Sequence, residues 1–259
     1  MISTEARGVV AAYLLLRKAI GWIGILLPVV LIVGDAAFTP TPLPIDLSGY
    51  YYTPMRNILE GALFVLGVFL VAYDVGVLAE RWVTNVAGVG VLGVAFFPGT
   101  PDIPHLSTTQ HVVGYLHVAC ATVAFVALSV TMWRFARADS DGPGAPAPSR
   151  GAAIFYRASA AVMLGFLAIT GVANFLPVSV QQTTYLIFIF EALTIMTFGI
   201  SWLVKGRALQ SLLSAPGVPL TRSIRQGARS AAAPGEPPTV SSARTDSAPS
   251  PAQGTADSS

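Results

Sequence analysis

The chain has 259 residues, of which 53% are hydrophobic and 11% are charged, and its mean hydropathy is +0.65. An ordinary soluble protein carries about 25% charged residues, so this composition excludes soluble enzymes, nucleic-acid-binding proteins and secreted disulfide-stabilised domains. The formal net charge of +2 is too small to indicate a polyanionic partner, and the single cysteine, Cys120, cannot form an internal disulfide. The sequence therefore predicts an all-α, polytopic membrane protein.

Six apolar stretches are long enough to cross a bilayer as helices. A span needs roughly 20 mostly apolar residues, because the hydrocarbon core is about 30 Å thick and an α-helix rises about 1.5 Å per residue. These stretches are much longer than typical strands, and a helix satisfies its own backbone hydrogen bonds in lipid. The predicted spans are residues 19–38, 57–79, 82–98, 112–133, 158–177 and 184–204.

The spans divide the chain into an N-terminal segment (1–18), a transmembrane domain (19–207) and a C-terminal tail (208–259). Residues 4–16 are apolar enough either to lie along the interface as a helix or to extend the first span. The apolar run that follows is too long for a cleaved signal peptide. The tail is rich in Ala, Ser, Pro and Gly and has no apolar face, so we expect it to be disordered and cytoplasmic.

Positive charges predict the orientation, because Lys and Arg concentrate in cytoplasmic loops. Placing both termini inside puts fourteen of the fifteen Lys and Arg residues on the cytoplasmic side and leaves only Arg56 outside. The same orientation places all four tryptophans, Trp22, Trp82, Trp133 and Trp202, at the inner ends of spans, where indole rings favour the membrane–water boundary. Abundant Ala, Gly and Pro and few Lys relative to Arg indicate a bacterial protein, so we expect it in the inner (plasma) membrane.

Ionisable and polar residues within the spans are candidates for function, because each costs several kcal/mol in a bilayer unless it is paired, neutralised or in contact with water. They fall into two layers. The outer layer contains Asp35, Arg56, Glu60, His111, His117, Asn174 and Glu191, with Asp102 and His105 in the adjoining loop. The inner layer contains Tyr73, Asp74, Arg81 and Asn85.

The second span carries the most informative spacing. Arg56 and Glu60 are i,i+4 neighbours that can pair on one helix face. Glu60, Gly67 and Asp74 are seven residues apart, so they form a stripe that we expect to face the bundle centre. Structural alternatives stay open: the first pair is then an ion pair at the interface, and Asp74 pairs with Arg81.

Glu191 lies roughly 10 Å inside the sixth span and has no cation near it in sequence. It must therefore meet Arg56, a histidine or a bound ion, or remain protonated. We expect it to join a polar pocket that opens to the cell exterior, next to a cluster of three tyrosines. The predicted binding residues are Tyr51, Tyr52, Arg56, Glu60, His111, His117 and Glu191.

The histidine spacing does not predict a metal site. His111 and His117 are six residues apart, so they lie on different helix faces and differ from the i,i+4 pair that binds one metal from a single helix. A zinc site would need further ligands from other segments, such as His105, Asp102 or Glu191. The sequence identifies no cofactor.

Small residues are concentrated in two of the predicted spans. The third contains Gly88, Gly90 and Gly93, and the fifth contains Ala161, Gly165, Ala168 and Gly171. Small side chains let helices pack closely where lipid removes the hydrophobic driving force between them. We therefore expect these two helices to form the tightly packed middle of the bundle.

The segment SGYYYTPMRNILEGALFVLGVFLVAYD, followed by NVAGVGVLGVAFFP and a histidine that opens the next span, resembles a family of bacterial multipass proteins of unassigned activity. The likeness covers about residues 20–204 and implies a six-helix membrane fold. A more remote similarity is to alkaline ceramidases and progestin/adiponectin receptors. That superfamily carries an early Ser, His and Asp, for which Ser48 and Asp74 are the candidates here, and a late His-x-x-x-His motif, which is absent.

Three functions are consistent with the sequence. The first is a non-enzymatic membrane protein whose outward-facing polar pocket binds or conducts a small solute, a proton or a lipid headgroup. The second is a membrane hydrolase in which a metal held by histidines and carboxylates activates water against lipid or amide bonds. The third is a structural or scaffold subunit. In each case the lipid bilayer is a partner and nucleic acid is not.

Overall fold

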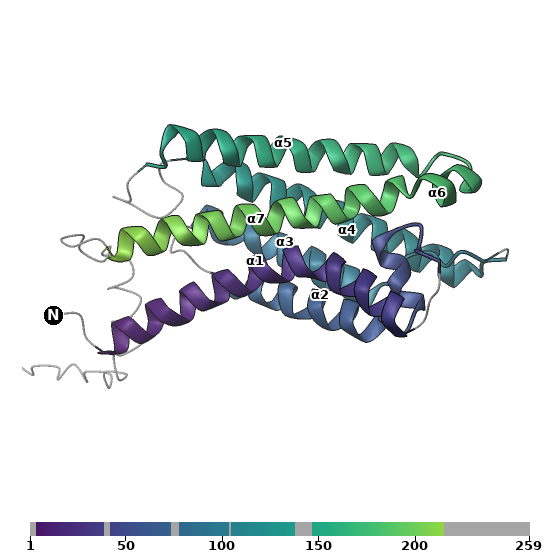
Figure 1. Cartoon of the computed structure of the whole chain (residues 1–259), viewed down its shortest axis with the longest axis horizontal. Coiled ribbons are helices and arrows are strands. Elements are labelled where there is room, and N and C mark those ends of the chain that lie inside the picture. The colour runs from purple at the N-terminus through teal and green to yellow at the C-terminus, as the bar shows by residue number, and fades with distance from the viewer. Residues whose placement is uncertain (1–3, 39–41, 74–77, 104, 138–146, 215–259) are drawn as a thin grey trace, which may run out of the picture.

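The computed structural model describes residues 4–38, 42–73, 78–103, 105–137 and 147–214. Every regular element within these ranges is a helix, so the predicted all-α class is confirmed. Six long helices run side by side along the longest axis of the molecule (Figure 1). They are α1 (Thr4–Phe38), α2 (Arg56–Val71), α3 (Leu78–Phe96), α4 (Thr108–Phe135), α5 (Arg150–Ala173) and α7 (Leu186–Ser214). Two short helices are the 3₁₀-helix η1 (Leu47–Tyr52) and α6 (Val178–Thr184).

Four of the long helices contain segments that are long and apolar enough to cross a membrane, as expected of a multi-pass membrane protein. These segments are Leu14–Phe38, Thr108–Phe135, Arg150–Ala173 and Leu186–Gly206. The other two helices are shorter: α2 has 16 residues, and the apolar part of α3 is Arg81–Phe96. Both fall below the roughly 20 residues that a simple span requires.

Several helix ends differ from the predicted span limits. Helix α1 is continuous from Thr4, which favours the extension of the first span over a separate interfacial helix. Helix α2 ends at Val71 instead of residue 79, and Asp74 lies outside the described residues. Helix α5 starts eight residues earlier than predicted because the Ser149 side chain accepts a hydrogen bond from the Ala152 N–H and caps the helix.

Helix α7 also extends further than predicted, to Ser214, into the segment assigned to the C-terminal tail. Residues 208–214 (ALQSLLS) are mostly good helix formers, so the helix continues past the apolar stretch. The remainder of the predicted tail lies outside the described residues. At its other end, α7 is separated from α6 by Tyr185, which has a left-handed backbone conformation with φ of 51°.

The six long helices form a closed ring. Each packs against the next along the chain, and the last, α7, packs against α1 as well as α5. Helix α4 also contacts α7 across the ring. One end of the bundle, here called the η1 end, contains η1, α6 and the first turns of α2, α4 and α7. The opposite end, here called the Arg17 end, contains the buried side chain of Arg17.

Glycines allow three of these helix pairs to approach closely. A Cβ atom on Gly199 of α7 would lie 2.6 Å from the Gly21 carbonyl oxygen of α1, and one on Gly88 of α3 would lie 2.7 Å from the Gly67 oxygen of α2. A Cβ atom on Gly90 would lie 2.9 Å from the Ala124 nitrogen of α4. No side chain fits at these distances, so the prediction that α3 packs tightly through its glycines is confirmed.

The corresponding prediction for α5 is wrong. Added Cβ atoms on Gly165 and Gly171 would meet nothing within 4 Å, and Ala161 and Ala168 are exposed. The small residues therefore lie on the outer face of α5. The sequence shows where small side chains lie along a helix, but the position of the helix in the ring determines which face contacts a neighbour. Helix α5 packs on α4 and α7 through other residues, including the buried Met163.

The Arg17 end encloses two cations among aromatic rings. Arg17 is fully buried, with its guanidinium carbon 5.4 Å from the Tyr73 ring centroid and 5.5 Å from that of Phe135. Lys205 is 3% exposed, and its Nζ lies 5.1 Å from the Phe135 centroid. These distances are in the range of cation–π attraction. Two of the cations that the sequence assigned to the cytoplasmic side are thus buried inside the bundle.

Trp202 belongs to this aromatic cluster and not to the bundle surface. Its ring is completely buried and lies 5.0 to 5.3 Å from the ring centroids of Tyr73, Phe135 and Phe198. The other three tryptophans, by contrast, are about half exposed or more. Burial in this cluster explains the position of Trp202 by packing, whereas the sequence argument explained it by the membrane boundary.

Candidate functional site

A cavity lies between α2, α3, α4 and α7, covered by η1 at one end. The centres of water molecules can occupy about 70 Å³ of it, which is room for several waters, since one needs about 10–15 Å³ by that measure. Most of the lining is apolar. The cavity therefore combines a mostly apolar interior with a small number of polar groups, as ligand sites generally do.

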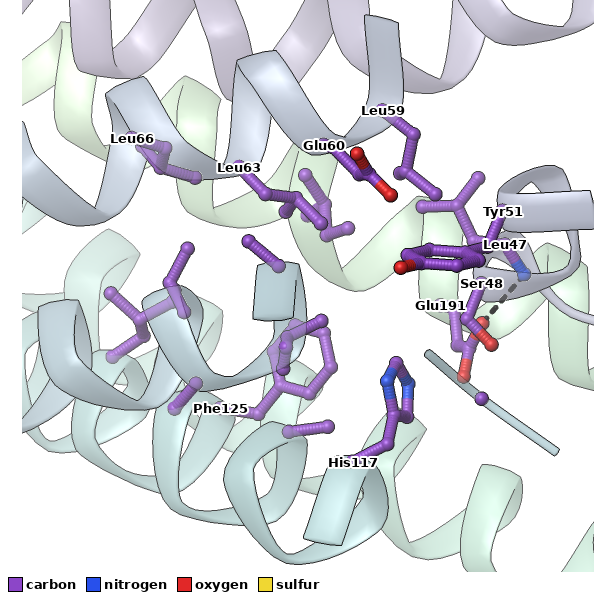
Figure 2. A pocket seen from close by; sticks show the side chains of 18 of the residues that line it. Leu47, Ser48, Tyr51, Leu59, Glu60, Leu63, Leu66, His117, Phe125 and Glu191 are labelled. Carbon is purple, nitrogen blue, oxygen red and sulfur yellow. Dashed lines mark hydrogen bonds between the residues drawn. The ribbon is translucent and has the colours of Figure 1, made fainter. Parts of the chain in front are cut away.

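The polar groups are gathered at the η1 end of the cavity. Figure 2 shows Ser48, Tyr51, Glu60, His117 and Glu191 on one side and Leu63, Leu66 and Phe125 on the other. Further apolar lining residues are Val91, Val94, Ala95, Ala121, Ala124, Leu128, Ile195 and Phe198. From His117 to Leu128 the lining extends about 16 Å along α4, at about 1.5 Å per residue. The cavity thus has a polar end and a long apolar end.

Glu191 connects α7 to η1. Its Oε2 accepts a hydrogen bond from the Leu47 backbone N–H at 2.8 Å, and nearby the Phe188 N–H donates to the Ile45 carbonyl at 3.1 Å. The rings of Phe188 and Tyr50 pack edge to face at 6.1 Å. In the described part of the chain, Glu191 forms no ion pair with a cation. Its carboxyl group therefore keeps one oxygen available to whatever occupies the cavity (Figure 2).

His117 presents one nitrogen to the cavity. Its side chain is 9% exposed, and Nδ1 lies 2.7 Å from the Phe97 carbonyl oxygen. A carbonyl can only accept a hydrogen bond, so Nδ1 carries a proton, and in the neutral form of the ring Nε2 is an acceptor. The fixed backbone of residue 97 thus sets both the tautomer and the direction of the ring.

Ser48 and Gly99 complete the wall near His117. Asp46 caps η1 by accepting hydrogen bonds from the Ser48 hydroxyl at 2.7 Å and the Gly49 N–H at 2.6 Å. A Cβ atom on Gly99 would overlap Ser48 Oγ and would lie 4.0 Å from His117 Nε2. Only glycine therefore lets the loop after α3 fit between these two side chains.

Arg56 and Glu60 form the predicted i,i+4 ion pair, with Nε donating to Oε1 at 2.6 Å. Arg56 also donates from Nη2 to the Tyr51 hydroxyl at 2.8 Å, and its guanidinium carbon is 4.2 Å from the Tyr51 ring centroid. About half of the Arg56 side chain is exposed. The arginine therefore holds two lining residues from the solvent side without lining the cavity itself.

The other tyrosines of the cluster support the loop. The Tyr52 hydroxyl donates to the Gly99 carbonyl at 2.6 Å, which fixes the glycine against Ser48. Tyr50 is completely buried, and burial together with the nearby charge of Asp35 raises the pKa of Tyr50 to about 12. Its hydroxyl therefore stays protonated at neutral pH, and neither ring lines the cavity.

The remaining polar residues of the predicted outer layer lie apart from the cavity. His111 is exposed on α4 and stacks on Tyr115, with 6.5 Å between the ring centroids. Asp102 accepts a hydrogen bond from Gln182 Nε2 at 3.0 Å, and the Asn174 side chain donates to the Thr170 carbonyl of its own helix. Of the seven predicted binding residues, four line the cavity, namely Tyr51, Glu60, His117 and Glu191.

No metal-binding cluster is present in the described part of the chain, where no three His, Cys, Asp or Glu side chains lie close enough to hold an ion. A metal-dependent hydrolase needs such a set, commonly three protein ligands for a catalytic zinc. The hydrolase hypothesis thus finds no ligand set among these residues.

Sequence reasoning missed Gly99, the cap made by Asp46, and the apolar half of the cavity. The Asp46–Ser48 spacing is a signal that could have indicated a capped turn, since short polar side chains often bond to backbone two or three residues on. The apolar lining has no such signal, because a leucine beside a cavity and one in a packed core look alike in sequence.

Comparisons with protein-family models, with curated proteins and with solved structures give no match for this chain. The resemblance to a bacterial multipass family therefore stays a prediction, and the site has to be interpreted from its own chemistry.

Proposed function

We propose that this protein is a six-span membrane protein that binds an amphipathic, lipid-like small molecule in the cavity between α2, α3, α4 and α7. The polar head contacts Tyr51, Glu60, His117 and Glu191, and the apolar chain lies along the interior. The observation that carries this proposal is the division of one cavity, about 16 Å long, into a polar end and an apolar end. A fully polar solute would leave most of the apolar lining without contacts, whereas the chain of an amphiphile covers it.

The proposal includes an orientation. Both termini lie in the cytoplasm of a bacterial cell, and the η1 end faces the exterior across the inner membrane, as the distribution of Lys and Arg favours. Helices α2 and α3 then complete the six spans, although the apolar part of each is shorter than that of the other four. The ligand enters from the outer leaflet with its head near the membrane surface.

Cysteine labelling tests the topology. In a Cys120→Ala background, Ser179→Cys places a thiol on exposed α6 at the η1 end, and Gly151→Cys places one on exposed α5 at the Arg17 end. A membrane-impermeant maleimide added to intact cells should label the Ser179→Cys variant and leave the Gly151→Cys variant unlabelled until the cells are opened. The reverse pattern would overturn the orientation.

Filling the cavity tests the binding. Ala121→Phe puts a large side chain into the apolar end, and Ala119→Phe, two residues away on the exposed face of α4, is the matched control. Single-chain amphiphiles should raise the unfolding temperature of the wild type and of Ala119→Phe in lipid nanodiscs, because a ligand that binds only the folded state stabilises it. Ala121→Phe should lose this shift. Equal shifts in all three proteins would contradict the proposed site and favour the scaffold alternative.

A further inference from the structure

The polar end of the cavity offers hydrogen-bond acceptors more than donors. Glu191 has one oxygen bonded to the Leu47 N–H and the other free for a ligand, and in the neutral His117 ring Nε2 is an acceptor, because Nδ1 holds the ring proton toward a carbonyl. The Ser48 hydroxyl directs its proton to Asp46. A ligand head that satisfies these atoms must therefore donate hydrogen bonds.

The charges point the same way. Arg56, a cation at this end of the bundle, is already bound to Glu60 and Tyr51 on the solvent side. Glu191 lines the cavity and forms no ion pair within the described residues. Burial of a carboxylate without a counter-charge is unfavourable, so a positive group on the ligand would stabilise its charged form.

His117 provides an observation independent of the carboxylates. The ring is 91% buried, since 9% is exposed, and it points into the cavity while its other nitrogen is held by residue 97 (Figure 2). A quaternary ammonium could balance the Glu191 charge but could not donate a hydrogen bond to Nε2. A primary or secondary ammonium can do both.

We infer that the amphipathic ligand carries a protonated primary or secondary amine as its head, held between Glu191 and His117. This inference rests on the proposed function and adds the chemical class of the ligand. The ammonium donates charge-assisted hydrogen bonds to the free Glu191 oxygen and to His117 Nε2. The face of the Tyr51 ring nearby adds an attractive surface for a cation.

Four octyl probes that share one chain and differ in the head test this assignment. They are octylamine, octyltrimethylammonium, octanol and octanoate; the amine is protonated at neutral pH because alkylamines, like lysine, have a pKa of about 10.4. Binding is measured by thermal shift in nanodiscs of neutral lipid, for the wild type, Glu191→Gln and the control Ala119→Phe. Each probe also partitions into the bilayer, which changes its apparent affinity for every variant equally. Dividing each apparent affinity by that of the Ala121→Phe variant cancels this contribution.

The wild type and Ala119→Phe should bind octylamine about tenfold more tightly than octanol, as expected for one charge-assisted hydrogen bond, and octyltrimethylammonium and octanoate should bind more weakly than octylamine. Glu191→Gln should bind octylamine and octanol equally. If octanol binds as tightly as octylamine, or if Glu191→Gln keeps the preference, the assignment of an amine is wrong while the proposed function stands. Equal affinity for octylamine and octyltrimethylammonium would overturn the role of His117. If no probe binds in a manner that Ala121→Phe abolishes, the proposed function fails with it.

Discussion

The two ends of the bundle treat buried polar groups differently. At the Arg17 end, Arg17 and Lys205 are packed directly against the rings of Tyr73, Phe135 and Tyr156. At the η1 end, Glu191 and His117 each form one hydrogen bond to the backbone and present a second polar atom to the cavity. Burial alone therefore does not mark a site in a membrane protein. Open space combined with unused hydrogen-bonding capacity does, and this combination distinguishes the η1 end.

The largest expected effect tests the packing role of the Arg17 end. Trp202→Ala removes a ring that contacts Tyr73, Phe135 and Phe198 in the core, so it should lower the free energy of unfolding by about 3–5 kcal/mol. Trp82→Ala, in which the deleted ring is 63% exposed, is the matched control and should change it far less. Thermal unfolding in detergent measures both. Equal losses would show that the aromatic cluster is not the core of this end.

The next effect concerns the fit of the loop at the η1 end. Gly99→Ala places a methyl group where Ser48 Oγ lies, so η1 must shift, at a cost of about 1–3 kcal/mol. The same shift should weaken amphiphile binding, since Ser48 and His117 both lie beside this residue. Gly165→Ala is the control, because its added methyl group meets nothing within 4 Å. It should be neutral or slightly stabilising, by up to about 1 kcal/mol. Unchanged amphiphile binding by the Gly99→Ala variant would show that the loop at Gly99 is not part of the binding site.

The sequence predicted the membrane class and the approximate position of each long helix, because apolar runs of this length have few alternatives. It also predicted Glu60, His117 and Glu191 as site residues, since a charged or polar group in an apolar run needs a partner or a cavity. Helix geometry could also have excluded His111 from the site. Six residues along a helix amount to about 240° of rotation, so His111 and His117 cannot both face the ring's interior.

Other features depend on tertiary packing and have no local signal. Arg17 and Lys205 lie about 190 residues apart in sequence (205 − 17 = 188), and their burial requires α1 and α7 to close the ring. The exposed small residues of α5 and the packed glycines of α3 have similar sequence patterns. Only the position of each helix in the ring makes one face a contact and the other a surface.

A smaller effect on stability, paired with a large effect on binding, sharpens the contrast between the two ends. In Glu191→Gln the side-chain carbonyl can still accept the Leu47 N–H, so the free energy of unfolding should change by no more than about 1 kcal/mol. The preference for an ammonium head should disappear in the same variant. A large loss of stability would show that Glu191 is a structural residue like the core of the Arg17 end.

The smallest effect is expected at Arg56, which joins the polar end from the solvent side. Its ion pair with Glu60 is exposed, and exposed pairs gain little because water screens them and two long side chains must be ordered. Arg56→Gln should therefore leave the unfolding temperature unchanged within error. Because Arg56 also covers the outer face of Tyr51, its removal should speed both the binding and the release of an octyl amphiphile while leaving the affinity similar. Stopped-flow measurement of the two rates separates this covering role from a binding role. A fall in affinity caused by faster release at an unchanged binding rate would mean that the arginine itself contacts the ligand, and the polar end would then accept an anionic head in place of an amine.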